Sequence, residues 1–104
     1  MAKLMGIDVG STTVKVCVLS ESLEILYTSY ERHFARVKEC VLGQLSIVEE
    51  KFGVSVTGSA GLGLAERAKL SFVQEVQAAF TAIRKYYPDA DAAVELGGED
   101  AKII

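Results

Sequence analysis

The sequence predicts an α/β domain in which helices pack on a mixed five-stranded sheet. Three observations lead to this fold class. The first third of the chain alternates apolar and polar residues with a period of two. Two later segments carry apolar residues at helical spacings of three and four, and short apolar runs separate these segments. The 104 residues, half of them apolar, suit one domain or one piece of a larger one.

Three short strands are expected at the N-terminus of the chain. They cover residues 3–9, 13–20 and 24–32, and tight turns at Gly10 and at Glu21–Ser22 join them. Strands joined by such short turns pair with their sequence neighbours in the antiparallel sense. The N-terminal part is therefore expected to be an antiparallel meander.

Two amphipathic helices then alternate with two further strands. The stripe of the first helix consists of Phe34, Val37, Val41, Leu45 and Val48. Gly53 follows its last turn, where a helix C-terminal glycine is expected. Residues 54–57 predict a fourth strand and 92–96 a fifth, with a helix over 73–87 that Pro88 ends. The stripe of this second helix consists of Val76, Ala79, Phe80, Ile83 and Tyr87.

The predicted element order is βββαβαβ. Three antiparallel strands followed by two right-handed crossovers give a mixed five-stranded sheet with helices against it. This is the ribonuclease-H-like fold, which actin, the Hsp70 ATPases and the sugar kinases share. The last residues predict the opening of a further hairpin.

Composition excludes several classes of function. The net charge is −3 and the basic residues are dispersed along the chain, so a nucleic-acid partner is not expected. No apolar run is long enough to span a membrane, and the N-terminus has no signal-peptide pattern, so a cytoplasmic protein is expected. Cys17 and Cys40 have neither disulfide nor zinc spacing and are expected to pack as small hydrophobes.

The segment Asp8–Lys15 predicts a phosphate-binding hairpin at the turn between the first two strands. Gly10 permits the backbone to approach a phosphate closely, and Ser11, Thr12 and Thr13 add hydroxyl donors. Lys15 supplies a positive charge, and Asp8 at the strand end suits a Mg²⁺ ion held through water. The alternative is a hairpin whose polar residues only satisfy a turn.

A second glycine-containing turn follows the predicted fifth strand. Gly97 and Gly98 leave room for phosphate, and Glu95 or Asp100 would orient Mg²⁺ or the attacking water. In the predicted fold this turn lies beside the first hairpin, so the two turns would enclose a polyphosphate between them. A solvated acidic turn is the alternative.

Glu75 lies at the start of the predicted second helix. If it faces the site it positions a water, and if it faces solvent it is a helix N-terminal acid stabilised by the helix dipole. Both possibilities stay open.

Two other motifs are assigned structural roles. The glycine-rich segment 57–63 lacks the Gly-Lys-[Ser/Thr] ending of a P-loop, so a surface or packing loop is preferred. His33, the single histidine, is distant in sequence from both glycine turns. Capping or contact with a partner is favoured over catalysis for this residue.

Four segments in this order resemble the BadF/BadG/BcrA/BcrD ATPase family: Gly6–Lys15, Tyr30–Phe34, Thr57–Gly61 and Glu95–Lys102. The chain is most similar to activators of 2-hydroxyacyl-CoA dehydratases such as 2-hydroxyglutaryl-CoA dehydratase, including the long CoA-substrate-specific activases. The resemblance implies an ATPase that uses ATP and Mg²⁺ to drive an electron onto a dehydratase partner. It also implies a homodimer with a bridging [4Fe–4S] cluster.

The resemblance further assigns residues to the nucleotide site. The first phosphate loop would consist of Asp8, Gly10, Ser11, Thr12, Thr13 and Lys15, and the second of Glu95, Gly97, Gly98, Glu99 and Asp100. Glu75 matches an acidic residue at the start of the same helix. Asp8, Glu75 and Glu95 are the candidate catalytic residues, although short activators usually have Asp where this chain has Glu95.

The family's cluster cysteines would follow Ile104, and Cys17 and Cys40 do not match them. The chain, residues 1–104, is thus expected to be the N-terminal subdomain of an actin-like ATPase domain, without the adenosine-binding half. In isolation it is expected to be inactive. The alternatives are a small-molecule kinase of the same fold, acting on a sugar or acetate, and a nucleotide-binding module without turnover.

Overall fold

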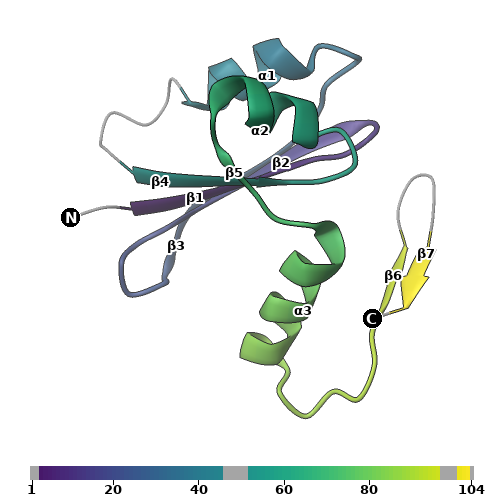
Figure 1. Cartoon of the computed structure of the whole chain (residues 1–104). Coiled ribbons are helices and arrows are strands. Elements are labelled where there is room, and N and C mark those ends of the chain that lie inside the picture. The colour runs from purple at the N-terminus through teal and green to yellow at the C-terminus, as the bar shows by residue number, and fades with distance from the viewer. Residues whose placement is uncertain (1–2, 46–51, 97–100, 104) are drawn as a thin grey trace.

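The computed structural model describes residues 3–45, 52–96 and 101–103. Its strands, in chain order, are β1 (Lys3–Val9), β2 (Thr13–Leu19), β3 (Ile25–Arg32), β4 (Phe52–Thr57), β5 (Ser71–Phe72), β6 (Val94–Leu96) and β7 (Ala101–Ile103). The helices are α1 (Val37–Leu45), α2 (Leu62–Ala68) and α3 (Glu75–Tyr86). Figure 1 shows the path of the chain through these elements.

A five-stranded mixed sheet in the order β3-β2-β1-β4-β5 forms the centre of the fold. The pairs β1–β2 and β2–β3 are antiparallel, whereas β4 is parallel to both β1 and β5. β1 is the middle strand and is paired along both edges. The prediction of an N-terminal antiparallel meander followed by parallel strands is therefore confirmed.

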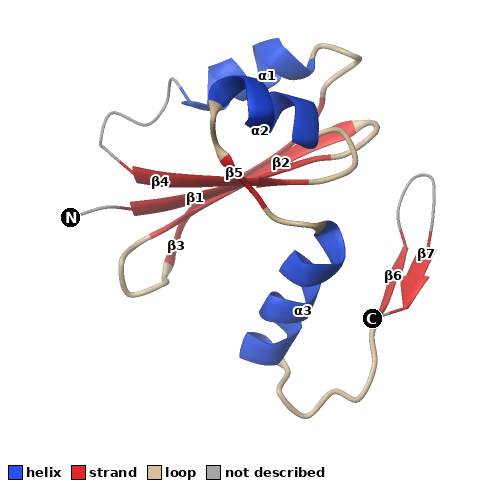
Figure 2. Cartoon of the chain, in the orientation of Figure 1, coloured by secondary structure: helices blue, strands red, loops and turns tan. Residues whose placement is uncertain are grey.

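The apolar core lies on one face of this sheet. The alternation in β1 and β2 turns one set of residues to that face, and α1 and α2 cover them, as Figure 2 shows. The buried residues are Met5, Ile7, Val9, Val14, Val16, Val18, Val56 and Ala65. Residues of both helices, among them Val37, Cys40 and Leu64, pack against this cluster. The opposite face of the sheet is not covered by α1 or α2.

The crossover from β4 to β5 differs from the predicted one. The segment predicted as a loop continues into α2, and β5 follows directly after it. The C-terminal end of α2 is closed by Lys69, which adopts a left-handed φ of 56°. The fifth strand of the sheet is therefore residues 71–72, not 92–96, and the element order is βββαβαβαββ.

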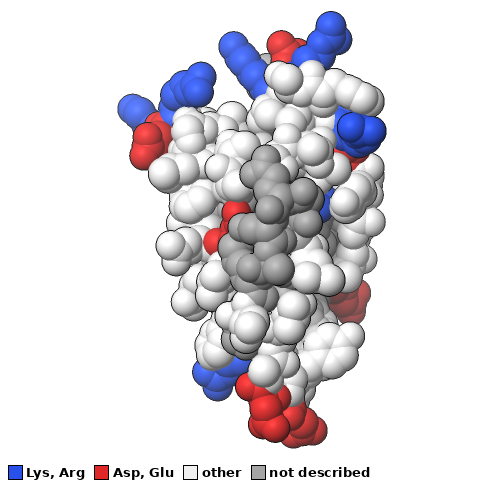
Figure 3. Space-filling view, turned by 90° about the vertical axis from the view of Figure 1, so that its right-hand side faces the viewer, with Lys and Arg blue, Asp and Glu red and all other residues white. Residues whose placement is uncertain are grey.

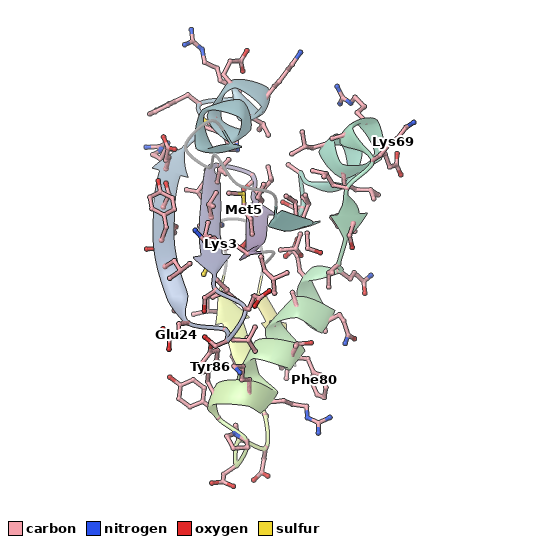
Figure 4. All side chains as sticks on the ribbon, turned by 90° about the vertical axis from the view of Figure 1, so that its left-hand side faces the viewer. Lys3, Met5, Glu24, Lys69, Phe80 and Tyr86 are labelled. Atoms are coloured by element: carbon pink, nitrogen blue, oxygen red, sulfur yellow. The ribbon has the colours of Figure 1, made fainter. Side chains whose placement is uncertain are left out.

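The predicted strand at 92–96 exists in part, as β6, but belongs to another sheet. β6 pairs with β7 in a two-stranded antiparallel sheet separate from the five-stranded one. The predicted helix over 73–87 corresponds to α3, and none of the residues of α3 is buried. Figure 4 shows the labelled Phe80 and Tyr86 projecting outward from α3, whereas Met5 lies inside the fold.

Two details of the predicted first helix are wrong. Phe34 belongs to the turn before α1, where it has a φ of 49° and is 74% exposed. Gly53 lies within β4, where it pairs with Leu4, instead of following the helix. The prediction extended the helix too far because the spacing of Phe34 matches the apolar stripe, although Phe34 precedes the helix. Val48 lies outside the described residues.

Candidate functional site

A group of polar side chains lies on the sheet face that α1 and α2 leave uncovered. In β1, Asp8 alternates with the buried Ile7 and Val9 and so points to the opposite face. Lys15 is its register partner in β2, and Thr57 is its register partner in β4. Strand pairing on both edges of β1 therefore gathers these three residues at one end of the sheet.

Lys15 is held by several partners at once. Its Nζ donates to Thr13 Oγ1 at 2.9 Å and lies 3.5 Å from Asp8 Oδ2. It also lies 5.6 Å from the ring centroid of Tyr30, its register partner in β3. The ammonium group therefore stays at the turn instead of extending into solvent. The ion pair is only partly buried, so its function is orientation more than stability.

Gly10, in the turn between β1 and β2, lies close to this ammonium group. A Cβ at Gly10 would lie 3.3 Å from Lys15 Nζ, tighter than an ordinary contact. The Gly10 N–H donates to the Thr13 carbonyl at 2.9 Å, which closes the turn, and Ser11 and Thr12 at its tip are exposed. Backbone and hydroxyl groups at the tip are thus accessible beside a fixed positive charge.

The end of β4 forms the other side of the site. Gly58 has a φ of 104°, and a Cβ there would lie 2.2 Å from the Val9 carbonyl oxygen and 2.6 Å from Asp8 Oδ1. The Ala60 N–H donates to the same Val9 carbonyl at 2.9 Å. The segment after β4 is therefore packed directly against the strand that carries Asp8. The structure therefore supports a packing role for segment 57–63, although its last two residues belong to α2.

The donor set fits a phosphate and a hydrated Mg²⁺ ion. The hydroxyl oxygen of Thr57, the register partner of Asp8, is buried and has no hydrogen-bond partner among the described residues. A buried hydroxyl normally has a hydrogen-bond partner, so a bound water or ligand is the expected partner of this atom. Oxygen ligands of this kind suit Mg²⁺, which usually keeps several of its waters.

The contacts described above do not include the remaining predicted residues. Glu75 is the first residue of α3 and is half-buried. Glu95 lies in β6, opposite Lys102 of β7. Gly97, Gly98, Glu99 and Asp100 lie outside the described residues. Their proximity to the first hairpin therefore stays a prediction.

Three contributors to the site were missed by sequence reasoning. Thr57 and Gly58 were assigned to a separate glycine-rich loop, and His33 to capping or partner contact. His33 is instead buried, and its Nε2 lies 3.0 Å from the Gly10 carbonyl oxygen. The register of β1 and β4 would have revealed Thr57, but no signal in the sequence connects His33 to a residue 23 positions away.

The cysteines do not form a metal site together. Cys40 of α1 packs against the core. Cys17 lies in β2 among the residues that point to the sheet face opposite the core. Within residues 3–45, 52–96 and 101–103, no cluster of three or more His, Cys, Asp or Glu side chains could hold a metal ion.

On the face shown in Figure 3, the coloured Lys and Arg side chains lie at the edges, several of them beside acidic ones, and form no continuous basic patch. In the part of the chain that the structure describes, no helix has the length and apolar character needed to cross a membrane.

The arrangement as a whole defines a class of fold. A β3-β2-β1-β4-β5 mixed sheet with helices against it is the ribonuclease-H-like fold of actin-like ATPases, and solved structures of that fold match this chain. The predicted fold class is thus confirmed, with the element order corrected as above.

Particular structures align with nearly the whole chain. Component A of (R)-2-hydroxyglutaryl-CoA dehydratase from Acidaminococcus fermentans aligns with a TM-score of 0.79 and 24% identity, over 100% of this chain and 42% of its own. The ADPNP-bound activator of 2-hydroxyisocaproyl-CoA dehydratase from Clostridium difficile has a TM-score of 0.71 and 24% identity, over 97% and 40%. A PPX-GPPA enzyme from Aquifex aeolicus has a TM-score of 0.59 and 15% identity, over 98% and 47%.

Sequence comparison adds one relative. The uncharacterized protein MJ0004 of Methanocaldococcus jannaschii is 28% identical over 105 aligned positions, which cover 97% of this chain and 42% of that protein. No protein-family model matches. The chain therefore spans about two fifths of the length of this relative, of component A and of the activator.

Proposed function

We propose that this chain is the N-terminal, phosphate-binding part of an ATPase that activates a 2-hydroxyacyl-CoA dehydratase-type enzyme. The observation that carries the proposal is the group formed by Asp8, Thr13 and Lys15 at the glycine turn of β1 and β2. The fold shared with component A and with the ADPNP-bound activator supports it. The four ordered sequence segments support it independently.

In this proposal each residue of the hairpin has a separate task. Lys15 neutralises charge on the outer phosphates, and its contacts with Thr13 and Tyr30 keep it aimed at the turn. Ser11 and Thr12 donate from the exposed tip, where Gly10 lets the phosphate approach the backbone. Preformed donors of this kind lower the reorganisation cost of binding a polyanion.

The Mg²⁺ ion would be held through water by Asp8, with the Thr57 hydroxyl beside it. When bound, the ion would neutralise part of the developing phosphate charge. Glu75 and Glu95 are proposed to orient the attacking water, together with the second turn formed by Gly97, Gly98, Glu99 and Asp100. The rest of the protein would supply the adenosine-binding half, the dimer contacts and the [4Fe–4S] ligands.

The first experiment measures binding of a non-hydrolysable ATP analogue to the full-length protein by calorimetry. Lys15→Met should weaken binding about 10- to 100-fold, because a charge-assisted hydrogen bond contributes roughly 1.5–3 kcal/mol. Lys38→Met, which removes an exposed lysine of α1, is the matched control and should leave binding unchanged. Equal affinity of the Lys15→Met variant and the unmodified protein would refute the assignment of the hairpin.

A second experiment separates the ATPase from its alternatives. ADP release by the full-length protein is measured with and without small hydroxyl and carboxylate acceptors. An activator should hydrolyse ATP without them, whereas strong dependence on an acceptor would indicate a kinase. Binding without any turnover would indicate a non-catalytic module. We expect negligible turnover from residues 1–104 in isolation, because the adenosine-binding half would be missing.

A further inference from the structure

His33, the single histidine of the chain, forms hydrogen bonds with the turn between β1 and β2. His33 is only 6% exposed and follows directly after β3. Its ring Nε2 lies 3.0 Å from the Gly10 carbonyl oxygen, and its backbone N–H donates to the Thr12 carbonyl at 3.0 Å. Both carbonyl groups belong to the turn that carries Ser11. One residue therefore contacts the turn twice.

The other ring nitrogen determines the protonation state of the imidazole. The Ala35 N–H donates to Nδ1 at 3.0 Å, and a backbone N–H can only donate. Nδ1 is therefore the unprotonated acceptor, which leaves the single ring proton on Nε2. The Nε2–H group in turn donates to the Gly10 carbonyl. These neighbours assign the neutral Nε2–H tautomer, because only this form satisfies both bonds.

This bond also sets the direction of a neighbouring donor. No peptide bond among the described residues is cis, so the Ser11 N–H points opposite to the Gly10 carbonyl. His33 lies on the α1 side, where it lines an open pocket of about 350 Å³ together with Arg36, Glu39 and Cys40. Because the Gly10 carbonyl bonds to His33 on the α1 side, the trans peptide turns the Ser11 N–H away from that side.

The backbone after His33 is strained in a way that serves this geometry. Phe34 and Ala35 both have left-handed φ angles, 49° and 63°, which non-glycine residues rarely adopt. The strained turn returns the Ala35 N–H to the imidazole, and the Arg36 N–H donates to the His33 carbonyl at 2.7 Å. Strain of this kind persists where the surrounding structure requires it, often near functional sites.

We infer that His33 is a positioning residue: as the neutral Nε2–H tautomer it holds the Gly10 carbonyl on the α1 side and thereby directs the Ser11 N–H toward a bound phosphate. The inference rests on the proposed function of the hairpin. It extends that function by adding a residue from β3's end that does not touch the nucleotide. The Phe34–Ala35 turn fixes the ring orientation.

Three substitutions in the full-length protein test the two ring nitrogens separately. In His33→Gln the amide nitrogen is as many bonds from Cα as Nε2, so the donor to Gly10 is retained. In His33→Asn the amide oxygen replaces Nδ1 as acceptor for Ala35, but no donor reaches Gly10. His33→Ala removes both groups. Binding of a non-hydrolysable ATP analogue and thermal unfolding are measured for each.

We expect His33→Gln to bind within about threefold of the unmodified protein, and His33→Asn and His33→Ala to bind at least about tenfold more weakly. The affinity of each variant should depend on whether a donor to the Gly10 carbonyl is retained, and not on the melting temperature of the variant. A purely structural histidine would make affinity follow stability, with Asn and Gln equivalent. Unchanged affinity in a folded His33→Ala variant would overturn the inference.

Nitrogen-15 NMR of the nucleotide-free, unmodified protein tests the ring tautomer that the inference requires. This measurement depends neither on the folding of the variants nor on nucleotide binding. The imidazole resonances should show the Nε2–H tautomer, and an Nδ1–H tautomer would overturn the assignment. In folded variants the Ser11 amide resonance should move in Asn and Ala but not in Gln. Failure of the unmodified protein to bind nucleotide, with these NMR results intact, would refute the proposed function and not the turn geometry.

Discussion

The region from β1 to β5 and the region from α3 to β7 are built differently. In the first, two helices cover a continuous apolar cluster whose side chains at Met5, Ile7 and Val9 are at most 2% exposed. In the second, α3 has no buried residue, and Leu96 and Ile103 of the β6–β7 pair are 79% and 81% exposed. Exposed apolar residues of this size commonly mark surfaces that contact other parts of a protein or a partner. The first region therefore contains a buried apolar core, whereas α3 contributes no buried residue.

The largest expected effect on stability is at Gly58, which follows β4 and packs against the strand that carries Asp8. Gly58→Ala should destabilise the protein by about 4 kcal/mol or more, because the new Cβ meets the Val9 carbonyl at a backbone φ of 104°. Gly63→Ala in α2 is the matched control, since its nearest contact is Arg67 at 3.6 Å. It should be neutral or stabilising by up to about 1 kcal/mol. Chemical denaturation measures both, and equal stabilities would contradict the close packing at Gly58.

The next effect compares the cores of the two regions directly. Ile7→Ala should cost about 3 kcal/mol, because it leaves a cavity around a side chain that is 1% exposed. Phe80→Ala in α3 should cost less than about 1 kcal/mol, since Phe80 is 44% exposed. Both values come from denaturation of the 104-residue chain. Similar costs for the two substitutions would show that α3 packs as firmly as the sheet.

A smaller effect of opposite sign is expected at the end of α2. Lys69 has a left-handed φ of 56°, which glycine adopts without a steric penalty. Lys69→Gly should therefore stabilise the protein by about 0.5–1 kcal/mol, whereas Lys69→Ala should change its stability little. Thermal unfolding of the three proteins tests the sign. Destabilisation by glycine would mean that Lys69 contributes contacts that outweigh the strain.

The smallest effect on stability is expected at the polar group itself. The Lys15–Asp8 pair spans 3.5 Å between half-exposed side chains, so Lys15→Met should alter the free energy of unfolding by at most about 1 kcal/mol. The same substitution should strongly weaken nucleotide binding, as argued above. A loss of stability as large as that of Ile7→Ala would show that Lys15 supports the fold more than the site.

The same difference between regions explains what the sequence could predict. β1, β2 and β3 were predicted closely because alternation and short turns are local signals. α2 was missed because Gly63 and the two glycines before the helix resemble a loop, and β5 because two residues carry no period. The strand at β6 was detected, but nothing local to it tells which sheet it joins. Strand partners are set by tertiary packing.

The candidate site divides in the same manner. Asp8, Thr13 and Lys15 were predicted as a group because one hairpin carries them all. His33 and Thr57 reach the site through β3 and β4, and their placement depends on strand register and on the strained turn at Phe34–Ala35. Residue types and spacing reveal contacts within a motif. They do not reveal contacts between motifs that only the folded sheet brings together.

The central position of β1 has a consequence for how such a protein can change over generations. Consecutive residues of this strand serve opposite purposes, with Ile7 and Val9 facing the core and Asp8 facing the polar group. A substitution at either kind of position alters one purpose and leaves the other intact. Loss or gain of a single residue reverses every position beyond it and places Asp8 among valines. Descendants of this hairpin can therefore vary by substitution, while insertions and deletions within β1 are expected to be eliminated.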